Sequence, residues 1–217
     1  MIEDPHFYFW AIPAVLLVGL AKSGFLSGFG AVATPLMAMA VPVPQAAAIM
    51  LPLLCLMDLA SLQQLWHDRD GPLLRLLLPA GLVGIAMGTV LFGAVSAPVV
   101  SVIVGALTLL FLLQRLAVKP RAHGPAPSRA WGFIAGVLSG FTSFVAHAGG
   151  PPISAYVLPM RLDPIRVTAT LAVFFSVVNL AKWVPYAALG LFDALGLADV
   201  RLADAGRSRR RSALSAR

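Results

Sequence analysis

Two short segments of the chain combine glycine, hydroxyl side chains and proline in a similar order. The first is SGFLSGFGAVATP at 23–35, and the second is SGFTSFVAHAGGPP at 139–152. Glycine permits backbone conformations that other residues resist, and proline removes a backbone donor and ends or restarts a helix. Each segment therefore predicts a helix that breaks and restarts, which leaves backbone N–H groups free at the restart.

Free N–H groups at the start of a helix carry the positive end of its dipole and favour an anion. Hydroxyl groups in both segments add donors. The alternative interpretation is that these small residues only let helices pack closely. Because the pattern occurs twice, we predict that both segments bind a small anion. The predicted contacts are Ser23, Gly24, Ser27, Gly28, Gly30, Thr34, Pro35, Ser139, Gly140, Ser143, Gly149, Gly150 and Pro151.

Ionisable side chains next to these segments extend the predicted site. Lys22 directly precedes the first segment. It is predicted to attract the anion, or else to reach from a helix end towards the membrane surface. His147 lies at the break of the second segment, where an imidazole can hydrogen-bond an anion or titrate near neutral pH. Both residues join the predicted anion contacts.

Asp58 and Lys182 lie within long apolar runs, where a charge is costly and marks function by default. Asp58 is predicted to couple transport to protons, with a polar contact between helices as the alternative. Asn179 precedes Lys182 by three residues, so both share one helix face, and Asn179 joins the predicted anion contacts. Three roles are predicted for Lys182 as alternatives: a second anion contact, a partner for Asp58, or a buried structural group. We assign the coupling role to Asp58 and Lys182.

Other classes of chemistry lack their sequence signals. The chain contains no G-x-x-x-x-G-K-[ST] motif for ATP and no G-x-S-x-G elbow for a nucleophile. His147 has no Cys, Asp or Glu neighbour at metal-ligand spacing, and the single Cys55 cannot form an intrachain disulfide. We therefore expect no enzyme, no metal and no cofactor.

The composition indicates an integral membrane protein. Of the 217 residues, 59% are hydrophobic and 12% are charged, whereas soluble domains carry about a quarter charged residues. The net charge of +7 owes much to the stretch after residue 200, which is rich in arginine. No basic face of a folded domain is visible, so a nucleic-acid partner is not expected.

The apolar runs predict the helices. A helix needs about 20 mostly apolar residues to cross a bilayer. Clear runs lie at 45–65, 75–95, 98–118 and 167–190. Glycine and proline break two longer stretches, 7–41 and 131–160, and each predicts a hairpin of two short segments. The expected fold is an all-α polytopic bundle with about eight membrane segments, because lipid excludes open sheet edges.

Lys and Arg in the loops predict the orientation. The 119–130 loop and the 66–74 connection contain these residues and are predicted to be cytoplasmic. The 42–44 and 96–97 connections contain neither and are predicted to face outward, as is the N-terminus.

An internal repeat is visible. Ser23–Ser27 returns as Ser139–Ser143, and Asp58 pairs with Asn179 after a small slip in the offset. Residues 1–118 and 131–198 are therefore predicted to be two membrane repeats joined by a linker at 119–130. The 42–44 connection has no basic residue, whereas its counterpart at 161–166 has two arginines and should face inward. The repeats are thus predicted to be inverted, a recurring plan of secondary transporters.

The second repeat is incomplete, because nothing after residue 190 matches the two spans at 75–118. Residues 199–217 form a basic tail that we expect to be disordered. Two explanations are open: a truncated or frame-shifted reading frame, or a natural disordered tail on a shorter protein.

The duplicated glycine-rich hairpins, the short basic linker and the chain length resemble the TauE/SafE family of sulfite exporters over residues 7–195. The pattern SG-x-x-SG-x-G…P at 23–35 is similar to the first hairpin of the family. The second hairpin departs from it at 144–147 and keeps the end of the motif at 149–151. The resemblance implies a multi-pass permease of the cell inner membrane that exports sulfite or small organosulfur anions.

The predicted function is export of small anions by alternating access, in which one repeat moves against the other. The expected partners are a small anionic substrate and the lipid bilayer. Gly81, Gly84 and Gly88 permit close packing within the chain or between chains, so the sequence is compatible with a homo-oligomer. The alternative function is a non-transporting membrane scaffold or an inactive truncated permease.

Overall fold

The computed structural model describes residues 5–22, 29–117 and 127–192, and every regular element in these ranges is helical. The α-helices are α1 (Pro5–Lys22), α2 (Ala33–Met37), α3 (Val43–Leu65), α4 (Gly71–Ala94), α5 (Ala97–Ala117), α6 (Arg129–Ala146), α7 (Gly150–Val157) and α8 (Pro164–Ala188). The 3-10 turns are η1 (Phe29–Val32), η2 (Trp66–Asp68) and η3 (Leu158–Met160). The prediction of an all-α fold is confirmed.

Five of these helices are long and apolar enough to cross a membrane. They are α1, α3 with its following turn, α4, α6 and α8, and α5 adds a shorter apolar run at Pro98–Leu110. Large apolar side chains such as Leu56, Val90 and Val184 are exposed on their outer faces. Such faces are stable against lipid and not against water. The protein is therefore a multi-pass membrane protein.

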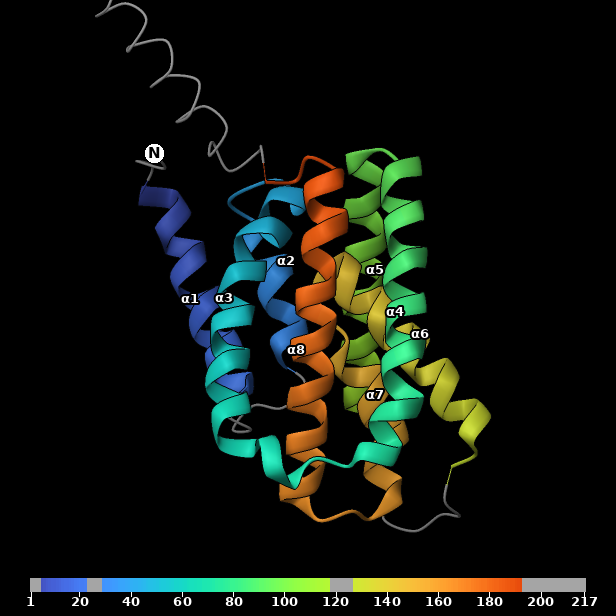
Figure 1. Cartoon of the computed structure of the whole chain (residues 1–217). Helices are drawn as coiled ribbons and strands as arrows, with labels where there is room; N and C mark the ends of the chain where they lie inside the picture. Colours follow the sequence, from blue (N-terminus) through green and yellow to red (C-terminus); the bar gives the residue numbers. More distant parts are fainter. Residues whose placement is uncertain (1–4, 23–28, 118–126, 193–217) are drawn as a thin grey trace, which may run out of the picture.

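The two ends of the bundle differ in charge. In Figure 1 the α3–α4 and α7–α8 connections lie at the lower end, where Arg69 and Arg161 are found. The start of α3 and the α4–α5 connection lie at the upper end, and neither carries Lys or Arg. We call the lower end the basic end. The connections that contain Arg thus lie at one end of the bundle, and those without Lys or Arg lie at the other. The assignment of the basic end to the cytoplasm stays a prediction.

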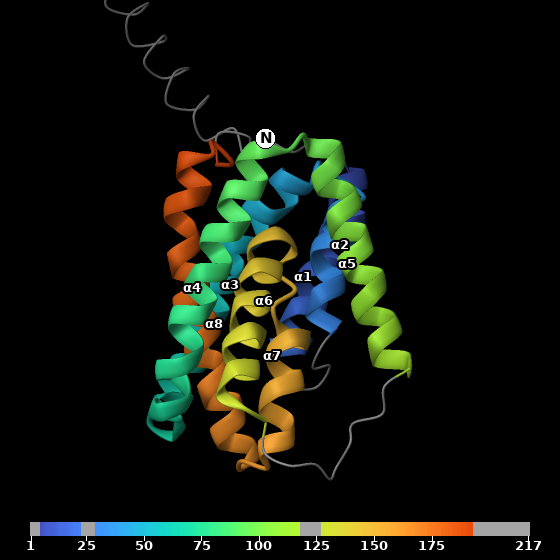
Figure 2. The ribbon, with the colours of Figure 1, turned by 90° about the vertical axis from the view of Figure 1, so that its right-hand side faces the viewer.

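Both glycine-rich stretches form helical hairpins, and they run in opposite directions. Along the chain α1 descends towards the basic end and α2 rises, whereas α6 rises and α7 descends (Figures 1 and 2). The first arms have 18 residues each, and the second arms have 5 and 8. The prediction of two short arms is therefore wrong for α1 and α6. An 18-residue helix is about 27 Å long, close to the hydrocarbon thickness.

Helices α4 and α6 form the most extensive helix pair of the described residues. A Cβ atom on Gly140 would overlap the carbonyl oxygen of Gly81, and one on Gly84 would overlap the carbonyl oxygen of Val137. Gly88 makes room for the ring of Phe144. These glycines therefore serve packing within the chain, since only residues without a side chain let the two backbones approach so closely.

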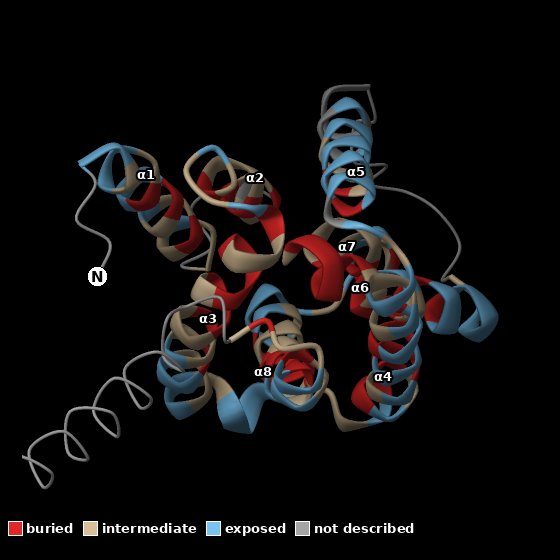
Figure 3. Ribbon diagram, turned by 90° about the horizontal axis from the view of Figure 1, so that it is seen from above, coloured by how far each residue is buried: buried red, intermediate tan, exposed pale blue. Residues whose placement is uncertain are grey.

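Helix α8 lies between α3 and α4, as the view along the bundle shows (Figure 3). It runs antiparallel to α3 (Figure 1). Buried apolar side chains of α3, α4, α6, α7 and α8 form the main core. A second apolar cluster joins α1 and α2 to the opposite side of α3. Helix α3 therefore connects the first hairpin to the rest of the bundle.

Candidate anion-binding site

Polar side chains from both hairpins meet around the α3–α8 pair. Two of them contact one buried carboxylate, and two others contact one buried ammonium group. We call the whole set the polar cluster. It consists of Lys22, Asp58, Asn179, Ser143, His147 and Lys182.

Asp58 on α3 is 3% exposed and uses both of its carboxylate oxygens. The ammonium group of Lys22, at the end of α1, forms an ion pair with Oδ1. The amide Nδ2 of Asn179 on α8 donates to Oδ2 at 2.6 Å. A buried carboxylate is stable only with such donors. Asp58 thus connects the end of the first hairpin's long arm to α8.

Lys182 is fully buried one helical turn further along α8. Its Nζ donates to the carbonyl oxygen and to the hydroxyl of Ser143, both at 2.9 Å. The ring nitrogen Nδ1 of His147 lies 3.0 Å from the same Nζ. An ammonium group has three N–H donors, and three acceptors surround this one.

The hydrogen bonds of His147 determine which of its ring nitrogens carries the proton. Nε2 lies 3.0 Å from the carbonyl oxygen of Ala47 on α3, and a carbonyl can only accept. Nε2 therefore carries the hydrogen, and Nδ1 is free to accept from Lys182. In this arrangement the imidazole is neutral, and it connects the break of the second hairpin to both α3 and α8.

The turn after α6 fixes the position of His147. This residue ends the helix in the left-handed region, at φ 53°. The hydroxyl of Ser139 donates to the carbonyl oxygen of Gly149 at 2.6 Å, and that of Thr142 lies between the carbonyl oxygens of Leu138, at 2.8 Å, and Ala148, at 3.1 Å. A Cβ on Gly149 would lie 2.7 Å from the carbonyl oxygen of Ser139. The sequence SGFTS…HAGG therefore builds a tight turn that orients His147 and Ser143 towards Lys182.

The two halves of the polar cluster form one electrostatic unit. Asn179 and Lys182 lie three residues apart on α8, and both Asp58 and Lys22 interact electrostatically with Lys182. Lys22 ends the long arm of the first hairpin, and His147 ends that of the second. The cluster therefore joins the ends of both long arms across the interior of the bundle.

The structure brings six of the predicted site residues together and places others around them. Ser139, Gly140 and Gly149 shape the second hairpin and its packing on α4. Gly150 and Pro151 begin α7, and a Cβ on Gly150 would meet nothing within 4 Å. Ser23, Gly24, Ser27 and Gly28 lie outside the described residues, as do residues 119–126 of the predicted linker and the whole predicted tail.

Thr34 differs from the other hydroxyl residues of the bundle. It is fully buried near the start of α2, and it is the one buried side chain of the described residues whose polar atom has no hydrogen-bond partner. The hydroxyls of Thr89, Thr108 and Ser176, in contrast, bond to carbonyl groups of their own helices. Gly30 and Pro35 flank Thr34 in the second arm of the first hairpin.

Sequence reasoning missed two parts of the site. The carbonyl group of Ala47 accepts from His147, and nothing in an alanine side chain signals that role. Tyr186 lies four residues after Lys182 and donates its hydroxyl hydrogen to the carbonyl oxygen of Phe144 at 2.7 Å. Its spacing on α8 was the available signal, because residues four apart share a helix face.

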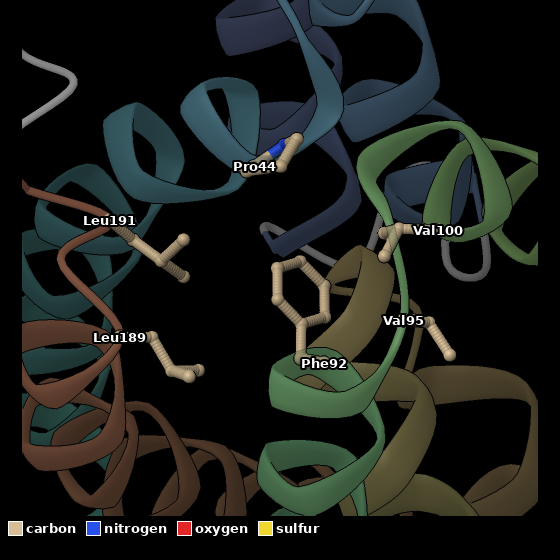
Figure 4. A pocket seen from close by; sticks show the side chains of 6 residues that line it. All are labelled: Pro44, Phe92, Val95, Val100, Leu189 and Leu191. Atoms are coloured by element: carbon tan, nitrogen blue, oxygen red, sulfur yellow. The ribbon is translucent and has the colours of Figure 1, made fainter.

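Two cavities of the described residues lie away from the polar cluster. One, of about 160 Å³, lies at the end opposite the basic end and is lined by Pro44, Phe92, Val95, Val100, Leu189 and Leu191 (Figure 4). The other is an apolar groove of about 330 Å³ between α1, α2 and α3. An anion needs hydrogen-bond donors, and the lining side chains are apolar apart from Tyr8 of the groove. The polar cluster is therefore the better candidate for the anion site.

Aromatic rings lie between the first cavity and the polar cluster. Phe92, which lines the cavity, stacks edge-on against Phe144 with ring centres 5.8 Å apart. Phe144 stacks in the same way on Tyr186 at 5.1 Å, and Tyr186 lies beside His147 at 6.3 Å. These rings close the bundle between the cluster and the end opposite the basic end. No group of three His, Cys, Asp or Glu side chains suited to a metal occurs in the ranges that the structure describes.

Long apolar helices, two broken hairpins and a buried charged cluster are the features of a polytopic membrane transporter. Residues 11–203 match the family model described as sulfite exporter TauE/SafE. Because the match covers most of the chain, the protein belongs to the TauE/SafE family, a family of membrane transporters. The resemblance noted in the sequence is thereby confirmed. A search of curated proteins and a search of solved structures each found no match.

Proposed function

We propose that this protein exports small anions, such as sulfite or small organosulfur anions, and that the anion binds at the polar cluster. The observation that carries the proposal is that Lys182 is buried and bonded only to uncharged acceptors. This ammonium group is fully buried inside the bundle and is held by neutral acceptors, two on Ser143 and one on His147. A charged acceptor forms a stronger hydrogen bond than a neutral one. An entering anion can therefore displace one of these groups.

The α3–α8 pair supports the proposal of alternating access. Asp58 and Asn179, which the sequence pairs as equivalent residues of two repeats, are hydrogen-bonded to each other. Equivalent residues meet where a twofold axis passes between them. The opposite directions of the two hairpins fit the same axis (Figure 1). A rocking motion of one repeat against the other would pivot about this contact.

We place the entry of the anion at Lys22, the partly exposed end of the Lys22–Asp58 pair. The side chain of Lys22 is 22% exposed, whereas Lys182 is fully buried and the rings of Phe144 and Tyr186 lie beyond it. In the proposed cycle the anion enters past Lys22 and reaches Lys182, and the aromatic contact then opens. Thr34, Gly30 and Pro35 extend the proposed path on the side of the first hairpin, and Ser23 and Ser27 stay predicted anion contacts.

The test is anion efflux from liposomes that contain the purified protein. Sulfite, methanesulfonate and acetate are loaded in turn, and release is compared between the wild type and Lys182→Met, which keeps the length of the side chain and removes its charge. Ser176→Ala is the matched control, because it removes a buried hydroxyl from the same helix that bonds only to its own helix.

We expect Lys182→Met to lower efflux at least about tenfold, since the anion loses its charged contact, and Ser176→Ala to keep the wild-type rate. Equal efflux in wild type and Lys182→Met would remove the cluster from the path. Efflux no faster than from protein-free liposomes for every anion would favour the scaffold alternative.

A further inference from the structure

The polar cluster contains an unequal number of positive and negative charges. We assign a positive charge to Lys22, which pairs with Asp58, and to Lys182, whose Nζ is surrounded by three acceptors; the carboxylate of Asp58 supplies the negative charge. His147 is neutral in its hydrogen-bonded tautomer. Residues 23–28, which follow Lys22, contain no ionisable side chain. Within the described ranges the cluster therefore has two positive charges and one negative charge.

The surplus positive charge belongs to Lys182. The carboxylate of Asp58 is occupied by Lys22 at one oxygen and by Asn179 at the other. Lys182 instead bonds to a carbonyl oxygen, a hydroxyl and a ring nitrogen, none of which is charged. A buried charge without a counter-charge is unfavourable in the low-dielectric interior of a membrane protein.

We propose that the site selects singly charged anions, because one negative charge neutralises the polar cluster and a second one would leave it negative. The inference rests on the proposed function and adds the charge class of the substrate. The anion replaces Ser143 Oγ or His147 Nδ1 at the ammonium group of Lys182. Asp58 acts as the selectivity residue, since its carboxylate compensates Lys22 and repels additional negative charge near Lys182.

The test varies the charge of the probe and of the cluster independently. Methanesulfonate and sulfate are both sulfur oxyanions of similar size, and they carry one and two negative charges at neutral pH. Binding of each is measured by isothermal titration calorimetry to the purified full chain in lipid nanodiscs. The wild type should bind methanesulfonate at least about tenfold more tightly than sulfate, since a tenfold ratio needs only a small difference in electrostatic free energy.

Three variants change the net charge in steps. Lys22→Gln lowers it by one, and we expect methanesulfonate binding to weaken about tenfold although Lys182 is intact. Asp58→Asn raises it by one and should shift the preference towards sulfate. The double variant Lys22→Gln/Asp58→Asn restores the wild-type net charge without an ion pair. It should therefore recover methanesulfonate binding to within about threefold of the wild type.

The shift of preference towards sulfate in Asp58→Asn is the decisive result, because loss of a merely structural ion pair would weaken the binding of both anions alike and leave their ratio unchanged. A wild type that prefers sulfate, or a double variant no better than Lys22→Gln, would overturn the inference. Efflux from liposomes separates the two proposals. Sulfate efflux that exceeds methanesulfonate efflux refutes the charge class alone, whereas absence of efflux for both anions refutes the proposed function.

Discussion

Two helix pairs form the interior of this protein, and they are built in opposite ways. The α4–α6 pair is lined by glycines whose missing side chains let the backbones touch. The α3–α8 pair contains Asp58, Asn179 and Lys182 within a membrane-spanning bundle. Helices in lipid gain no hydrophobic energy by associating, so close packing stabilises the first pair. Polar groups there cost free energy, so the second pair is the candidate for function.

Phe144 connects the two pairs. Its ring packs against Gly88 of α4 on one side and against Tyr186 of α8 on the other. A displacement of α8 would therefore shift the ring of Phe144 and change its packing at the α4–α6 interface. The comparison predicts that substitutions in the glycine-lined pair act chiefly on stability, whereas substitutions in the polar pair alter anion binding and transport as well as stability.

The largest expected effect is at the glycine contact. Gly140→Leu would drive a side chain into the carbonyl group of Gly81, so we expect the protein to lose about 3 kcal/mol of stability or more. Gly105→Leu on α5 is the matched control, because a Cβ there meets nothing within 4 Å. Thermal unfolding in detergent measures both. Equal midpoints for the two variants would show that the α4–α6 contact is not the stabilising one.

The next effect separates a broken ion pair from a removed one. Asp58→Leu leaves Lys22 without its counter-charge, and we expect a loss of about 2–3 kcal/mol, reduced by the partial exposure of Lys22. Lys22→Met/Asp58→Leu removes both charges and should recover most of this stability. Chemical unfolding of both variants against the wild type gives the comparison. A double variant as unstable as the single one would mean that the pair itself stabilises the fold.

A smaller effect is expected at the hairpin break. Gly149→Ala places a Cβ 2.7 Å from the carbonyl oxygen of Ser139 and should displace His147, so we expect efflux to fall several-fold and stability to fall by about 1–2 kcal/mol. Gly150→Ala is the adjacent control in open space. Liposome efflux and thermal unfolding are measured on both. Similar efflux in the two variants would argue against a role for this turn in orienting the site.

The smallest effect is expected at Tyr186. Tyr186→Phe leaves the carbonyl oxygen of Phe144 without its donor, which should cost about 1 kcal/mol while the ring contacts remain. Thermal unfolding of Tyr186→Phe against the wild type tests the loss. Methanesulfonate binding should stay at the wild-type value, and a tenfold loss would place the hydroxyl among the anion contacts.

The sequence predicted much of the fold and a substantial part of the site. The four clear apolar runs correspond to α3, α4, α5 and α8, and the two broken stretches correspond to the hairpins. The spacing of Asn179 and Lys182 predicted their common face. The lengths of the hairpin arms were mispredicted, because glycine at 132, 136 and 140 was compatible both with a break and with the packing of a continuous helix.

Composition alone determined that this protein belongs in a membrane, because a chain with 59% hydrophobic and 12% charged residues has too little polar surface to be solvated by water. The charged residues within apolar runs likewise stood out from the sequence. Only the tertiary structure decided which of them meet. Asp58 and Asn179 are 121 residues apart, and their contact depends on how α3 and α8 are rotated and crossed. Packing of the whole bundle sets those angles, since no local sequence rule fixes them.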